Sequence, residues 1–130
     1  MNVKQVILMR TDLNMRKGKM VSQGAHAAMA WMSKLIKENL KSYTSVGEFT
    51  MTLEQTYWFE GLFTKICLQC SSEEELLKLY DEAKAAGLTV HLITDSGLTE
   101  FAGVPTKTCI AIGPNEAEDI DKITKHLKLL

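Results

Sequence analysis

Two acidic residues and one lysine occupy positions in the sequence where chemistry is expected. Asp12 follows an apolar run at Val3–Arg10, and Asp95 follows another at Leu88–Thr94. Ligands of open α/β sheets bind beyond the carboxyl ends of such strands. Lys19 stands at the expected start of a helix, where backbone N–H groups and an ammonium group suit a phosphate or a developing oxyanion. The spacing therefore predicts an anion site close to a carboxylate.

Structural interpretations of the same residues remain open. Lys19 can be a solvent-exposed lysine, although a cation in the first helical turn opposes the helix dipole unless it meets an anion. Asp95 begins an Asp-Ser-Gly turn, in which aspartate commonly bonds its own backbone. Lys19, Gln23 and His26 share one helical stripe at i, i+4 and i+7. For His26, spacing alone favours a buried histidine that is hydrogen-bonded to backbone.

The cysteines do not indicate a metal site. Cys67 and Cys70 form a C-x-x-C pair, but they fall in the expected strand Phe63–Cys70. Residues three apart on a strand point to opposite faces, and no second Cys/His pair follows at zinc-finger spacing. We therefore predict buried structural thiols and no metal. The sequence also lacks a G-x-S-x-G elbow, an H-x-x-x-H pair and a P-loop.

The elements that must position these side chains follow from periodicity and turn chemistry. After the strand at Val3–Arg10, the patterns predict a helix over about 19–41, a short helix over 52–59, a strand over 63–70, a helix over 71–86 closed by Gly87, strands over 88–94 and 108–113, and a last helix opened by Pro114-Asn115. We expect one α/β domain over residues 1–130, with a four-stranded mixed β-sheet flanked by helices on both faces. Helical crossovers imply parallel pairs, whereas the last two strands can run either way.

Composition and charge narrow the class of protein. The chain has 130 residues, of which 45% are hydrophobic and 24% charged, as in an ordinary globular domain. No apolar run suits a membrane span or a signal peptide, so we expect a cytoplasmic protein. Residues 1–41 carry a net charge of +6 and residues 42–130 carry −7. The basic segment indicates either an anionic partner or an uneven solvated face, and charge alone does not decide between them.

Longer motifs resemble one known family. The segments that carry the resemblance are Arg10-x-Asp12-Leu13-x-Met15-x-x-Gly18-Lys19-x-x-x-Gln23-x-x-His26-Ala27, then Asp95-Ser96-Gly97-Leu98-Thr99-Glu100, Pro105-Thr106-x-Thr108, Ile112-Gly113-Pro114, and an ending at Ile120–Leu129. They are similar to the archaeal/eukaryotic-type (type 2) peptidyl-tRNA hydrolases over nearly the whole chain except about residues 40–60. Two features depart from the family pattern: Ser96 replaces a usual alanine, and the stretch from Glu100 to Thr108 is one residue longer, so Thr106 and Thr108 compete for one family position.

The resemblance implies a fold, an activity and partners. It implies a mixed four-stranded sheet, a homodimer, and hydrolysis of the ester between a peptide and the tRNA 3′ ribose. We expect no metal, no cofactor, no membrane and no DNA, with peptidyl-tRNA as the RNA partner. Two other functions stay open: deacylation of another acyl-tRNA, such as one carrying a D-amino acid, and a non-catalytic RNA- or protein-binding role on the same fold.

The resemblance also implies roles for single residues. Lys19 and Asp95 are the main catalytic candidates, and His26, Thr99 and Thr108 are supporting ones. In this scheme Asp95 orients or activates the water, Lys19 stabilises the oxyanion, and the two threonine hydroxyls fix the water or the substrate carbonyl. Four residues are expected to face the tRNA: Arg16, Lys17, Gly18 and Lys65.

Overall fold

The structure is a computed structural model that describes residues 1–130. Its elements in chain order are β1 (Val3–Arg10), α1 (Lys17–Glu38), β2 (Leu40–Ser42), β3 (Ser45–Val46), α2 (Leu53–Glu60), β4 (Lys65–Cys70), α3 (Glu73–Ala85), β5 (Val90–Asp95), β6 (Thr106–Glu116) and α4 (Ala117–Thr124). No helix in the structure combines the length and the apolar character that a membrane crossing requires.

Four strands form one mixed sheet in the order β4-β1-β6-β5. Strand β1 pairs parallel with β4 and antiparallel with β6, and β5 pairs antiparallel with β6. Strands β1, β4 and β5 therefore run in one direction and β6 in the other. The loop from β5 to β6 contains no crossover helix, so the chain returns antiparallel beside the strand it has just left.

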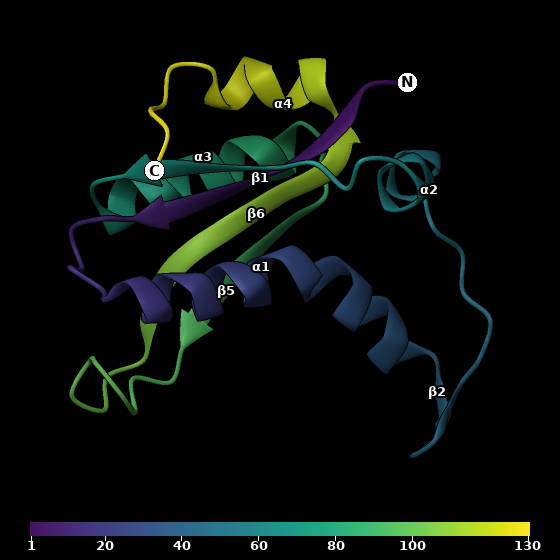
Figure 1. The fold of residues 1–130 in the computed structure, drawn as a ribbon, viewed down its shortest axis with the longest axis horizontal. Coiled ribbons are helices and arrows are strands. Elements are labelled where there is room, and N and C mark those ends of the chain that lie inside the picture. The colour runs from purple at the N-terminus through teal and green to yellow at the C-terminus, as the bar shows by residue number, and fades with distance from the viewer.

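Helices cover both faces of this sheet, with α1 on one side and α3 and α4 on the other (Figure 1). Strand β1 serves both layers because its side chains alternate between the faces. Val6 and Leu8 belong to the core beneath α3 and α4, whereas Ile7 and Met9 belong to the core beneath α1. This double burial explains why β1 reads as a continuous apolar run. The predicted fold class is confirmed.

The helix boundaries follow their caps. Ser72 accepts a hydrogen bond from the Glu75 backbone N–H at 3.0 Å and so begins α3, as the capping spacing predicts. After α3, Gly87 adopts a φ of +75°, a conformation that glycine reaches without strain. Helix α2 begins after Thr52, whose side chain accepts from the backbone N–H of Gln55.

Two expectations about local structure were wrong. The last helix begins at Ala117, not at Pro114, because the segment before it is held as sheet: β6 pairs its residues 115 and 116 with residues 4 and 3 of β1. Cys67 is exposed, whereas Cys70 is buried as predicted. Strand β4 is the edge of the sheet, and α1 leaves the Cys67 side of it open. The pair β2–β3, a small hairpin, was not predicted at all.

Candidate active site

The first turn of α1, the end of β5 and the loop that follows β5 meet at one edge of the sheet (Figure 1). Because β1 and β5 run parallel, their carboxyl ends lie at the same end of the sheet, as predicted from the sequence. Helix α1 has no acidic residue in its first turn, and Arg16 at its N-cap position makes no side-chain cap. No residue of the helix itself therefore neutralises the positive end of the helix dipole.

Lys19 reaches from α1 to the end of β5. Its Nζ lies 2.9 Å from Oδ1 of Asp95 and 2.7 Å from Oγ1 of Thr99. The side chains of Lys19 and Asp95 are only 12% and 11% exposed. An ammonium group has three N–H donors, so these two bonds leave one for a ligand. Phe101 lies beside the group, with its ring centroid 5.7 Å from Nζ.

Asp95 is held by three hydrogen-bond donors. Its Oδ1 accepts from Lys19 and, at 3.1 Å, from Nε2 of Gln23, while its Oδ2 accepts from the backbone N–H of Gly97 at 2.9 Å. The hydrogen bond from Lys19 lowers the pKa of Asp95 most, and burial opposes it as the second-largest effect. The bond from Gly97, the charge of Lys19 and the bond from Gln23 lower the pKa further, so the net shift is downward. The carboxylate is therefore ionised throughout the neutral range and is a weak proton acceptor.

Behind Asp95, a buried hydroxyl orients Gln23. Oγ1 of Thr108 donates to Oε1 of Gln23 at 2.6 Å, and both residues are almost fully buried. This bond turns the Gln23 amide nitrogen toward Asp95. Thr106 instead donates to the carbonyl of Val104, so it is Thr108 that joins the cluster. Gln23 was absent from the candidate residues, although its place on the Lys19 stripe was the signal that pointed to it.

Gly97 is required by the geometry of the loop. Its φ is +82°, and a Cβ there would come within 2.2 Å of the carbonyl oxygen of Val104. Any larger residue would move the backbone N–H that binds Asp95. Asp95 therefore accepts a hydrogen bond from the backbone of its own turn and also one from Lys19. Its place in the Asp-Ser-Gly turn does not prevent it from being part of the Lys19–Asp95 cluster.

Two other candidates lie apart from this cluster. Asp12 forms a two-point ion pair with Arg10, at 3.0 and 2.7 Å, and this guanidinium lowers the pKa of the carboxylate. Asp12 therefore anchors the end of β1. His26 is exposed rather than buried and makes no hydrogen bond to Lys19 or Asp95. It lies on the same side of α1, one turn beyond Gln23.

The expected tRNA-facing residues divide into two groups. Arg16, Lys17 and Gly18 are exposed at the start of α1, next to Lys19, and the Arg16 guanidinium stands 3.9 Å from the Glu100 carboxylate. Lys65 lies on β4, at the opposite edge of the sheet from Asp95. Its ammonium bonds the Phe63 carbonyl and stands 3.4 Å from the Phe63 ring centroid, and burial lowers its pKa.

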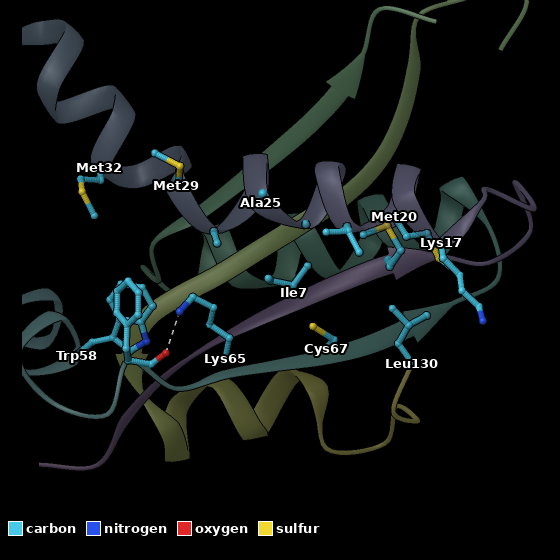
Figure 2. Close-up of a pocket in the computed structure, with 15 residues that line it drawn as sticks. Ile7, Lys17, Met20, Ala25, Met29, Met32, Trp58, Lys65, Cys67 and Leu130 are labelled. Atoms are coloured by element: carbon cyan, nitrogen blue, oxygen red, sulfur yellow. Dashed lines mark hydrogen bonds between the residues drawn. The ribbon is translucent and has the colours of Figure 1, made fainter. Parts of the chain in front are cut away.

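A large apolar groove runs between α1 and the β4 edge. Figure 2 shows Met29 and Met32 of α1 facing Lys65 and Cys67 of β4, with Trp58 at one end. The groove encloses about 800 Å³, and 12 of its 15 lining residues are hydrophobic. It lies on the other flank of α1 from Asp95, so it is separate from the acid–lysine cluster.

The clustered groups suit a hydrolysis in which the substrate carbonyl is polarised and an ordered water attacks it. The structure brings no group of three or more His, Cys, Asp and Glu side chains into an arrangement that can hold a metal ion. A fixed ammonium at a helix N-terminus can stabilise a developing oxyanion, and a fixed carboxylate can orient water. The cluster therefore has the parts for hydrolysis of a carboxylic ester.

Comparison with known proteins agrees with this chemistry. The family described as "Peptidyl-tRNA hydrolase PTH2" matches residues 3–130. A peptidyl-tRNA hydrolase of Methanocaldococcus jannaschii is 38% identical over 98% of this chain and 100% of its own length, and one of Haloquadratum walsbyi is 39% identical over 98% and 99%. A probable peptidyl-tRNA hydrolase 2 of Dictyostelium discoideum is 38% identical over 97% of this chain, which spans 54% of that protein. On this similarity over almost its whole length, the chain belongs to the PTH2 family of peptidyl-tRNA hydrolases.

Proposed function

We propose that this protein hydrolyses the ester bond between a peptide and the 3′ ribose of tRNA. The observation that carries the proposal is the Lys19 ammonium, held by Asp95 and Thr99 with one N–H left free. Full-length similarity to proteins named peptidyl-tRNA hydrolase supports the same substrate. In the reaction, water adds its oxygen to the acyl carbon, the bond from that carbon to the ribose oxygen breaks, and the ribose oxygen takes a proton from the water.

In this mechanism Lys19 and Asp95 act as one unit. The free N–H of Lys19 binds the carbonyl oxygen and strengthens its bond as negative charge develops there. Asp95 holds Lys19 in place and orients the attacking water. Its lowered pKa supports a positioning role over a role as general base. Thr99 fixes the ammonium from the loop side.

The supporting residues take different roles in the proposal. Thr108 is a positioning residue that acts through Gln23, because its hydroxyl is buried and already bonded. Gln23 in turn directs Asp95. His26 has no bond to the cluster, and we assign it to substrate binding. Arg16, Lys17 and Gly18 contact the tRNA beside the ester, where charge attraction makes binding salt-dependent.

Lys65 remains a proposed tRNA contact with a specific geometric requirement. It lies at the far edge of the sheet, three strand spacings from β5, or about 14 Å across the sheet. Lys65 is also the first residue of β4, whereas Asp95 is the last residue of β5, so the two lie toward opposite ends of the strands, and Figure 2 shows Lys65 well away from Lys17 at the start of α1. Only a macromolecular substrate touches both residues. Lys65→Ala is expected to weaken tRNA binding less than Arg16→Ala does.

The deciding experiment is release of labelled N-acetyl-aminoacyl groups from purified tRNA. We expect hydrolysis of the N-blocked substrate and little release of a D-amino acid from D-aminoacyl-tRNA. EDTA should not abolish activity when magnesium is supplied separately to keep the tRNA folded. Activity lost to a chelator and restored only by zinc would contradict the metal-independent mechanism. Faster release of the D-amino acid would assign the deacylase function instead, and RNA binding without hydrolysis would indicate the non-catalytic one.

We also propose a homodimer that acts in the cytoplasm. The apolar groove beside α1 supports self-association, because contiguous apolar patches on soluble proteins commonly mark contact surfaces (Figure 2). Light scattering of wild-type protein and of Met29→Glu tests this. A monomeric mass for the wild type would refute the homodimer. A dimeric mass for Met29→Glu would refute the apolar groove as its interface. A tRNA substrate supports the compartment, and fractionation of the producing cells tests it.

A further inference from the structure

A second groove lies beyond the Lys19–Asp95 cluster, on the β5 side of α1, and shares Ala25 and Met29 of α1 with the apolar groove. It lies between α1 and β5 and encloses about 910 Å³. On the strand side its lining includes His91 and Ile93, and on the helix side His26, Ser33, Lys34 and Lys37. None of these residues binds the Lys19–Asp95 pair.

The side-chain spacing along β5 and along α1, which form the two walls of the groove, places the groove in line with the Lys19–Asp95 cluster. Residues 91, 93 and 95 alternate onto one face of β5, so His91 and Ile93 continue the line on which Asp95 stands. On α1, spacings of three and four residues place Lys19, Gln23, His26, Lys34 and Lys37 on one side. At 1.5 Å per residue, His26 lies about 10 Å and Lys37 about 27 Å from Lys19 along the helix.

The charge of the groove is positive. Lys34 and Lys37 are exposed, and Glu38 is the one acidic residue in the lining, with its carboxylate 3.9 Å from Lys34 Nζ. Lys84 of α3 lines the adjoining hollow together with Lys34 and His91, so it adds positive charge at the far end. The groove beside β4 offers no comparable run of cations, since two lysines there accompany 12 hydrophobic residues.

The two histidines add flat rings to the charged groove. His26 is exposed, and His91 is half-buried in the strand-side lining of the groove. Burial, and then the charge of Lys34, lower the pKa of His91, so its ring is neutral near pH 7. Grooves that bind single-stranded nucleic acid combine cations along the backbone with rings on which bases stack. Ala30 and Ser33 have small side chains, which leave room in the groove for a nucleic-acid strand.

The proposed substrate sets which part of an RNA can lie here. The ester is carried by the last ribose, so the nucleotides nearest to Lys19 are the unpaired ones at the tRNA 3′ end. We propose that the groove between α1 and β5 binds this unpaired 3′ end, with Lys34 and Lys37 on its phosphates and His26 against a base. This inference rests on the proposed function and adds the path of the RNA and its binding residues.

Binding of a deacylated RNA minihelix tests the path without any hydrolysis. The probes are a fluorescent minihelix with the unpaired 3′ nucleotides and the same minihelix with a blunt end. Lys34→Gln/Lys37→Gln is compared with Lys122→Gln/Lys125→Gln, a matched pair in the last turn and at the C-cap of α4, which covers the other face of the sheet. Lys34 and Lys122 are similarly exposed, at 66% and 70%, and each stands near one acid on its own helix.

The proposal predicts a loss confined to one protein and one probe. Lys34→Gln/Lys37→Gln should bind the minihelix with the unpaired end about tenfold more weakly, and its plot of log affinity against log salt should be shallower by about 1.4, from about 0.7 per phosphate contact. The blunt minihelix and the α4 variant should show neither change. Equal losses on both probes, or no loss at all, would overturn the proposal.

Two variants of His26 test the stacking contact. His26→Ala should weaken binding of the unpaired end about fivefold or more, whereas His26→Phe should retain most of it, because phenylalanine keeps a flat ring. Equal binding by both variants would remove His26 from the path. Failure of hydrolysis with these binding effects intact would refute the proposed function alone. Normal hydrolysis with unchanged binding would refute the groove alone.

Discussion

Replacement of Thr108 by valine removes one buried hydroxyl and keeps the shape of the side chain. Oε1 of Gln23 then loses its donor at a site with no access to water. An unsatisfied buried acceptor costs about 1–3 kcal/mol. With an unfolding entropy of about 2.1 cal/mol/K per residue, a chain of 130 residues should lose about 4 to 11 °C in Tm.

The same change should lower turnover without touching the substrate. Once released, the Gln23 amide no longer points its nitrogen at Asp95, and small displacements of catalytic groups cost up to about 100-fold in rate. We expect Thr108→Val to reduce kcat by about 10- to 100-fold with little change in KM. Thr108→Ser keeps the hydroxyl and should restore most of the activity.

A double variant separates stability from activity. In Gln23→Leu/Thr108→Val both polar partners become apolar, so no buried acceptor is left and stability should return to within about 1 kcal/mol of the wild type. Activity should stay low because Asp95 still lacks its Gln23 donor. Thermal melts and steady-state hydrolysis of N-acetyl-aminoacyl-tRNA measure the two effects. Full activity in well-folded Thr108→Val would refute the positioning role of this pair.

Three further predictions concern the cluster and its surroundings. Lys19→Ala and Asp95→Asn should each lower kcat by about 100-fold or more with the fold retained, and near-normal turnover in either folded variant would remove that residue from the mechanism. The folded-state pKa of Asp95 lies below its ordinary value, so the ionised carboxylate contributes stability above the unfolded pKa, near 3.9, and this stability is lost as the pH falls through the folded pKa. Protonation of Asp95 should therefore cause no loss of kcat between pH 7 and pH 5. A loss of kcat in this range that disappears in Asp95→Asn would contradict this prediction. Arg16→Ala/Lys17→Ala should weaken tRNA binding and flatten its salt dependence while the turnover of bound substrate changes little, and an unchanged salt slope in filter binding would show that these residues face solvent.

Local sequence patterns determined much of the fold. The apolar run of β1, the Ser72 cap and Gly87 depend on interactions within a few residues or on burial that any sheet must provide, so they were predictable. The same holds for Lys19 and Asp95, whose positions at a helix start and a strand end follow from local structure. Because β1 and β5 run in the same direction, their carboxyl ends lie at one end of the sheet, where α1 begins.

Tertiary structure decided what depends on contacts between distant segments. Pro114 lies in β6 because the neighbouring residues pair with β1, more than 100 positions away in the chain, and this pairing overrides the local signal for a helix start. Cys67 is exposed because β4 is the edge strand, which no periodicity reveals. Thr108 could be distinguished from Thr106 only when Gln23, 85 residues away, was seen to accept its hydrogen bond. The groove between α1 and β5 likewise exists only where a helix and a strand far apart in sequence come together, since a sequence pattern specifies faces but not the partner each face meets.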